Sequence, residues 1–242
     1  METKTYLSFE TTLDRSFEVY KKTFLIAGIA FLLLTVVLLM MFMTGVNFFF
    51  GFENFAEKMK TFNPEELSTE GTLMYFGGLS LIVILIAPFN AGILKIMKDA
   101  DEGQEEPTIS SLFYYINSKY FIPIVTTTIV LSLFGFILNI GLEKSIGGSS
   151  FGKVISMLIS IAFSVLTLIA LPNVIFKDMN PSEAIINSIT NCSRNFLKIL
   201  LLMIIALIIG YLGIIGLCIG IFFTFPIYFA MQYAIFKSFQ LK

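Results

Sequence analysis

The sequence predicts an all-α integral membrane protein with six transmembrane helices. Three observations predict this fold. Of the 242 residues, 56% are hydrophobic and only 14% are charged, whereas a soluble domain carries about 25% charged residues. The chain also contains five long intervals without any charged residue. Finally, an amphipathic segment, an apolar segment and a proline-bearing apolar segment recur in that order three times, which predicts three parallel repeats, each with a preceding interfacial amphipathic helix.

The charge-free intervals define the predicted spans. Because an α-helix rises 1.5 Å per residue, about 20 apolar residues cross roughly 30 Å of hydrocarbon. The first four intervals therefore predict one span each, and the much longer last interval predicts two. The intervals are residues 23–52, 71–94, 120–142, 154–176 and 199–236.

A cluster of glycines predicts the turn inside the last interval. Gly210, Gly213, Gly216 and Gly220 lie near its middle, where two antiparallel spans need a tight connection. Gly216 and Gly220 also have the spacing of a small-residue motif through which membrane helices pack closely. A helix-packing face is therefore the alternative to a turn.

The distribution of lysine and arginine predicts the orientation. With six spans both termini share one side of the membrane, and twelve basic residues fall on that side against four on the other. Cytoplasmic loops carry the excess of basic residues, so we expect both termini in the cytoplasm. The four residues on the outer side are Lys58, Lys60, Lys144 and Lys153.

The predicted interfacial helices share one apolar spacing. In each, apolar residues follow at steps of four, three and four, which places them on one face of an α-helix. Thr12, Thr108 and Ser182 stand where helix N-caps are expected. The apolar sets are Leu13, Phe17, Tyr20 and Phe24, then Ile109, Phe113, Ile116 and Tyr120, then Ile185, Ile189, Cys192 and Phe196.

Prolines mark the second, fourth and sixth spans, at Pro88, Pro172 and Pro226. Together with the amphipathic segments they divide the chain, a single polytopic domain over residues 1–242, into repeat units at about 8–98, 107–178 and 180–238. Proline is common in membrane helices, so chance recurrence is the alternative.

Polar residues within the spans are the candidate functional groups. Asn90 and Asn173 each follow a span proline closely, and Gln232 lies in the sixth span. Proline frees a backbone carbonyl, and polar side chains collect where backbone is freed. These three residues therefore either line a small polar cavity between kinked spans or make packing hydrogen bonds. Packing is also the expected role of a stripe on the fourth span at every fourth residue, made of Ser156, Ser160 and Ser164.

Composition argues against an enzyme. The chain has no histidine, which excludes histidine-based triads and most catalytic zinc sites. The two cysteines, Cys192 and Cys218, are expected to be apolar fillers. The acidic stretch at residues 99–107 lacks the spacing of a calcium loop, so metal binding is only an alternative to a solvated loop containing Glu102, Glu105 and Glu106. We expect no catalytic, cofactor or metal site.

Two further features limit the function classes. A net charge of −1 gives no basic patch for nucleic acid. No predicted span has a charge near its centre, which disfavours a proton- or sodium-coupled transporter.

Three stretches carry a resemblance to a known family. They read LDRSFEVYKKTF before the first span, KDADEGQEEPTISSLF after the second, and PSEAIINSITNCSRNFLKIL before the fifth. The chain resembles uncharacterised six-span bacterial inner-membrane proteins related to the membrane domain of some glycerophosphodiester phosphodiesterases. The resemblance implies a bacterial cytoplasmic membrane location and a link to lipid or envelope, and it implies no catalytic residues.

These patterns favour a non-enzymatic membrane protein that works through membrane lipids or a membrane protein partner. The alternative is a small-solute or lipid transporter with its site among the kinked spans. A membrane enzyme is the least favoured class, because no set of acid, base and nucleophile is present.

Overall fold

The computed structural model describes residues 7–50, 68–103, 106–215 and 220–240. Within these ranges the chain forms helices and turns without any β-strand. The all-α fold class is therefore confirmed for the described residues. The elements are α1 (Phe9–Phe50), α3 (Thr69–Glu102), the 3₁₀-helix η2 (Ile109–Phe113), α4 (Phe121–Ile146), α5 (Ser150–Leu166), α6 (Ala170–Lys177), α7 (Pro181–Arg194), α8 (Phe196–Leu212), α9 (Gly220–Thr224) and α10 (Ile227–Ser238).

Four helical segments of the described chain are long and apolar enough to cross a membrane. They lie in α1, α3, α4 and the combined α5 and α6. A fifth is present if α7 and α8, which meet at 95° across a short break, count as one span. A multi-span membrane protein is thus plausible from the structure, whereas six spans in three repeats stay a prediction.

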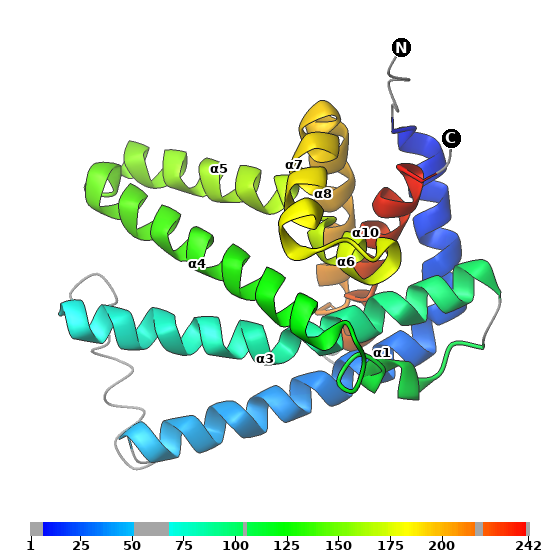
Figure 1. Ribbon diagram of the computed structural model, residues 1–242, viewed down its shortest axis with the longest axis horizontal. Coiled ribbons are helices and arrows are strands. Elements are labelled where there is room, and N and C mark those ends of the chain that lie inside the picture. Colours follow the sequence, from blue (N-terminus) through cyan, green and yellow to red (C-terminus); the bar gives the residue numbers. More distant parts are fainter. Residues whose placement is uncertain (1–6, 51–67, 104–105, 216–219, 241–242) are drawn as a thin grey trace.

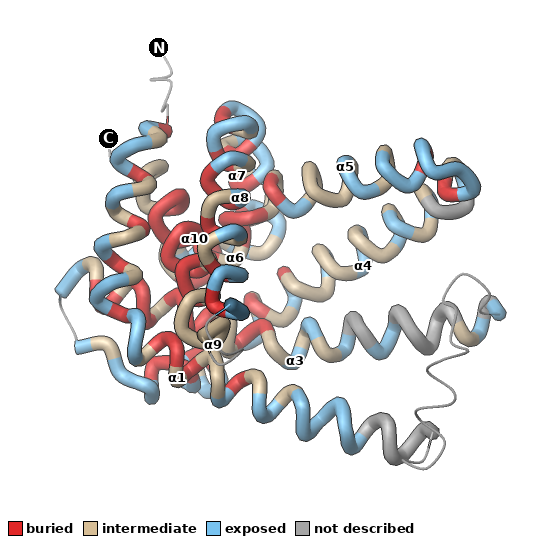
Figure 2. Tube along the Cα trace, turned by 180° about the vertical axis from the view of Figure 1, so that it is seen from behind, coloured by how far each residue is buried: buried red, intermediate tan, exposed pale blue. Residues whose placement is uncertain are grey.

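The helices form a compact region and two extended pairs. Figure 1 shows α1 with α3, and α4 with α5, extending in the same direction as antiparallel pairs. The first part of α1 packs on α10 and also contacts α8. These helices, with α6 and α7, form the compact region, where most buried residues lie (Figure 2). Apolar side chains on the extended pairs stay uncovered; Ile137 is 67% exposed and Met157 is 64% exposed. Such surface suits contact with lipid tails.

The first predicted interfacial helix and the first span form one unbroken helix, α1. Thr12 lies inside it, and its hydroxyl donates to the Ser8 carbonyl at 2.7 Å, so the predicted N-cap at Thr12 is wrong. The start and the end of α1 nevertheless point in different directions (Figure 1). The Thr23 hydroxyl donates to the Val19 carbonyl at 2.9 Å, a bond within the helix that is often associated with bending.

The second predicted interfacial helix is not α-helical. Ile109–Phe113 is a 3₁₀-helix followed by turns, and its N-cap residue Thr108 makes no side-chain capping bond. Leu112 is buried because its backbone lies against Gly92 of α3, where a side chain would not fit. The α-helical spacing did not reveal this close approach. The predicted apolar residues Ile109 and Phe113 are exposed.

The third predicted interfacial helix is present as α7. It begins two residues earlier than expected, because the Asn180 side chain caps it by accepting from the Glu183 amide at 2.9 Å. Ser182 is therefore not the N-cap. Pro181 occupies the first helical turn, where its missing N–H costs no hydrogen bond. The 95° bend to α8 matches the predicted change from an interfacial helix to a span.

The three span prolines have different local effects. Pro88 lies inside the continuous helix α3. Pro172 lies in the first turn of α6, just after the break from α5, and Pro226 caps α10 after the break from α9. The segments that follow these prolines are strongly buried, and α3, α6 and α10 contact one another. They form the centre of the compact region.

The break between α8 and α9 falls within the predicted glycine cluster, and part of this connection lies outside the described residues. α8 ends at Leu212 and α9 starts at Gly220. A Cβ on Gly220 would lie 2.5 Å from the Gly213 carbonyl oxygen, so these two segments of the backbone approach too closely for larger residues. Gly216 and Cys218 lie outside the described residues.

Candidate functional site

Asn173 connects α6 to α7. Its side chain is fully buried, and its amide nitrogen donates to the Ala184 carbonyl at 3.1 Å and to the Asn187 side-chain oxygen at 3.2 Å. The Asn173 side-chain oxygen has no hydrogen-bond partner in the described structure. Asn173 thus has a clear packing role, and its side-chain oxygen is an acceptor without a donor in the described structure.

The break between α5 and α6 is stabilised by side chains from other helices. Gln232 of α10 donates to the Leu168 carbonyl at 2.7 Å. Ser188 of α7 donates to the Leu166 carbonyl at 2.8 Å and accepts from the Ile169 amide at 3.2 Å. Buried backbone groups need such partners in an apolar interior. The sequence signalled Gln232 but not Ser188, whose one available sign was its place on the α7 face that includes Cys192.

The third candidate, Asn90, is half-buried in α3, two residues after Pro88. Asn173 and Gln232 thus bond to different backbone groups in the described structure, and a ligand-binding role for all three stays a prediction. The serine stripe supports the packing role only in part: one of its serines bonds to a neighbouring helix, and the buried Ser156 hydroxyl has no hydrogen-bond partner in the described structure. Ser160 donates to Asn139 of α4 at 3.1 Å, and Ser164 donates to the Ser160 carbonyl at 3.0 Å.

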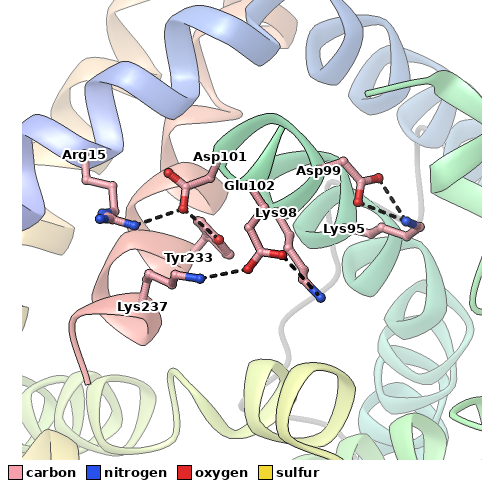
Figure 3. A network of polar contacts seen from close by, with 8 residues as sticks. All are labelled: Arg15, Lys95, Lys98, Asp99, Asp101, Glu102, Tyr233 and Lys237. Atoms are coloured by element: carbon pink, nitrogen blue, oxygen red, sulfur yellow. Dashed lines mark hydrogen bonds and ion pairs between the residues drawn. The ribbon is translucent and has the colours of Figure 1, made fainter. Parts of the chain in front are cut away.

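A charged cluster lies where α1, α3 and α10 meet (Figure 3). We define it as Arg15, Lys95, Lys98, Asp99, Asp101, Glu102, Tyr233 and Lys237. Its centre is Asp101, whose Oδ2 accepts from Arg15 Nη1 and from the Tyr233 hydroxyl, both at 2.9 Å. A carboxylate with two such donors fixes three helices relative to one another, and hydrogen bonds to charged groups contribute about 1.5–3 kcal/mol where they are buried.

The other two carboxylates of the charged cluster also pair with lysines. Lys95 and Asp99 form a pair at 3.0 Å one turn apart. Glu102 lies 2.8 Å from Lys237 and 3.8 Å from Lys98. Glu102 is the last residue of α3 and not a loop residue, and it pairs with these lysines although it is exposed. Lysine four residues before an acidic residue was the sequence signal for these pairs.

The metal-binding alternative receives no support from the residues that are placed. Among them, no group of three acidic, cysteine or histidine side chains is arranged to hold an ion. Glu105 lies outside the described residues, and Glu106 is exposed.

A small recess opens beside the charged cluster. It has a volume of about 50 Å³ and is lined by Lys98, Glu102, Phe176, Tyr233, Phe236 and Gln240; we call it the polar recess. Its walls come from the ends of α3, α6 and α10. None of Asn90, Asn173 and Gln232 lines it. Sequence reasoning missed this site because its members are separated by up to about 140 residues along the chain.

A second, exposed cluster joins α4 to the end of α6. The Tyr120 hydroxyl donates to Asp178 at 2.6 Å, and Lys119 lies 2.9 Å from the same carboxylate. These two donors hold the pKa of the Asp178 carboxyl below its usual value. Asp178 also ends α6 in the left-handed conformation, at φ 51°, which aspartate tolerates better than most residues.

Comparison with known proteins gives no relative from which function can be transferred. No protein-family model, no curated protein and no solved structure matches the chain.

Proposed function

We propose that this chain is a non-enzymatic integral protein of the bacterial cytoplasmic membrane that works through contacts with membrane lipids or a membrane protein partner. The proposal includes the six-span topology with both termini in the cytoplasm. It agrees with the resemblance to the inner-membrane family named above, which implies a link to lipid or envelope.

One observation carries the proposal: apolar surface is uncovered along the extended helices, while charged groups gather at the ends of α3 and α10. Of the described residues on α4, Ile122, Leu133, Phe134 and Ile137 are more than half exposed. In water this surface would favour aggregation, whereas in a bilayer it needs no other cover. The cations of the charged cluster come from α1, α3 and α10 (Figure 3), as the orientation rule expects for one membrane face.

The internal polar groups favour a packed centre over a transport path. The buried amides of Asn173 and Gln232 donate to backbone carbonyls, and Ser188 bonds to both sides of the helix break. A transporter needs polar groups that are free to exchange partners with a solute. The non-transporting function is therefore the better supported one.

Membrane insertion and orientation are tested by extraction and thiol labelling. We expect the protein to stay in the pellet after carbonate extraction. In a cysteine-free background, Ser150→Cys at the α4–α5 turn should react with a membrane-impermeant maleimide from outside intact cells. Ser182→Cys on α7 should react only after permeabilisation. Release by carbonate, or the reverse labelling pattern, would refute the proposed location or orientation.

Native mass spectrometry of the protein purified in mild detergent distinguishes the functions. A retained protein partner or a defined oligomer would support the proposal, whereas retained phospholipid alone is expected of a lipid transporter as well. A single enriched non-lipid solute at fixed stoichiometry would favour the transporter alternative and overturn the proposal.

A further inference from the structure

We propose that the polar recess binds the phosphate group of an anionic ligand, and that an anionic phospholipid headgroup supplies it. The inference rests on the proposed function, because it names the lipid chemistry that a membrane location makes available. It is carried by charge, by the way the cations are held, and by the size and place of the recess.

Cations outnumber carboxylates around the polar recess. Lys98, Lys237 and Lys177 line it or contact its walls, and Arg15 lies one contact further away. The carboxylates that pair with these side chains in the described part of the chain are Asp101 and Glu102. Glu102 in particular is shared between two ammonium groups. The excess positive charge favours an added anion.

Two of these ammonium groups are held by aromatic rings that do not neutralise them. Lys98 Nζ lies 5.2 Å from the centre of the Phe176 ring, and Lys177 Nζ lies 5.5 Å from the centre of the Phe236 ring. A cation–π contact attracts the ammonium group but leaves its charge and its N–H donors available. The Lys98–Glu102 distance of 3.8 Å is too long for a direct hydrogen bond. Lys98 can therefore turn toward an anion with little loss.

The dimensions of the polar recess select a small ionic group. Sites for drug-sized ligands usually enclose about 300–1,000 Å³, far more than the 50 Å³ present here. The Lys98 side chain is 37% exposed and that of Glu102 is 25% exposed, so the recess opens to the surface. A single phosphate can enter while the rest of its molecule stays outside.

The place of the recess indicates a lipid as the source of that phosphate. Its walls include the ends of α3 and α6. These are the ends of two apolar segments that are long enough to cross a membrane, at the points where charged residues begin. Basic residues at such ends lie near the headgroups and attract anionic lipids at the cytoplasmic surface. An anion held there would link α3, α6 and α10.

The test measures binding of dioctanoyl phosphatidylglycerol to the purified full-length protein in neutral detergent, with inorganic phosphate as a second probe. We expect one lipid per chain, and at least tenfold weaker binding when Lys98→Gln is combined with Lys237→Gln. The matched control combines Lys21→Gln with Lys22→Gln, which removes the same charge from two exposed positions on α1. The control should leave the dissociation constant within twofold of the unchanged protein.

A third variant gives the opposite sign and does not depend on losing a lysine. Glu102→Gln removes the carboxylate that competes for Lys98 and Lys237, so it should tighten binding several-fold. If the charged cluster only stabilised the fold, Glu102→Gln would lower stability without tightening any ligand. This variant keeps the proposal testable even if the double lysine variant fails to fold.

The two probes separate the possible sources of phosphate. Phosphatidylglycerol binding that inorganic phosphate competes away supports the lipid headgroup. Binding of inorganic phosphate alone, with the same dependence on Lys98 and Lys237, supports the phosphate site but rejects the lipid. No binding of either probe, or an equal loss in the Lys21 and Lys22 control, overturns the inference. That failure would leave carbonate extraction unchanged, so it is distinguishable from failure of the proposed function.

Discussion

Replacing Gly92 by alanine should separate α3 from η2 and destabilise the protein. A Cβ at Gly92 would overlap the Leu112 carbonyl oxygen and lie 2.6 Å from the Leu112 Cα. Carbon atoms in contact prefer about 3.5–4.0 Å, so the two backbones must part by about 1 Å. Overpacking of this kind costs about 1–3 kcal/mol, and the better helix propensity of alanine offsets about 1 kcal/mol of it. We therefore expect a net loss of up to about 2 kcal/mol.

The matched control is Gly141→Ala. Gly141 is an exposed residue of α4, and a Cβ there meets nothing within 4 Å. It gains the helix propensity of alanine without a clash, so it should be neutral or slightly stabilising. The two substitutions are chemically identical, and only the close approach to Leu112 distinguishes their effects.

Thermal unfolding in detergent can be followed through Cys192. This thiol is fully buried, so it reacts with a fluorogenic maleimide only when the structure opens. The experiment uses a Cys218→Ser background, in which Cys192 is the single cysteine of the chain. The midpoint of labelling should fall for Gly92→Ala and should not fall for Gly141→Ala. Equal midpoints for the two variants would refute the close packing of α3 on η2.

Three further predictions follow from the hydrogen bonds of the described residues. Ser188→Ala leaves two backbone groups at the α5–α6 break without their partner, so it should lower stability by about 1–3 kcal/mol in the same labelling assay. The control, Ser193→Ala on the exposed face of α7, should cost much less. Equal effects of the two substitutions would contradict the role given to Ser188. Tyr233→Phe removes one of the two donors to Asp101 and should lower stability by about 1 kcal/mol, measured by urea-induced unfolding in mixed micelles; an unchanged midpoint would exclude that bond. The pKa of the Asp178 carboxyl is lowered in the folded protein. The contribution of Asp178 to stability is therefore complete above about pH 4 and disappears as the pH falls through the lowered pKa. A series of unfolding measurements at different pH should show this loss in the unchanged protein and not in Asp178→Asn.

Sequence periodicity predicted helices well, and it predicted their ends less well. The apolar spacing identified α7 as a separate amphipathic helix, whose buried face packs against α4, α5 and α6. The same spacing at residues 109–120 did not produce an α-helix, because Gly92 allows α3 to lie directly against the Leu112 backbone. A contact between residues 20 apart cannot be read from a local period. The capping residue of α7 was similarly displaced, since Asn180 before a proline is a better cap than Ser182 after it.

The candidate site shows the same division between local and distant information. Pattern alone identified Asn173 and Gln232 as polar residues near broken helices, and the structure gives the reason, which is that their amides donate to carbonyls of other elements. The charged cluster was only half visible: the lysine and acidic residues of α3 are one turn apart, whereas Arg15, Tyr233 and Lys237 come from the two ends of the chain.

The charge balance of the polar recess likewise exists only in three dimensions. Along the sequence, Lys98, Lys177 and Lys237 each look like an ordinary basic residue at the end of a predicted span. Folding brings them around one recess in which Glu102 is shared by two of them. Lysines at the ends of separate transmembrane helices would each interact independently with many lipid headgroups and would not bind one headgroup specifically. Convergence on one small recess makes it possible to hold a single phosphate, and it is this convergence that the opposite effects of Lys98→Gln with Lys237→Gln and of Glu102→Gln would measure.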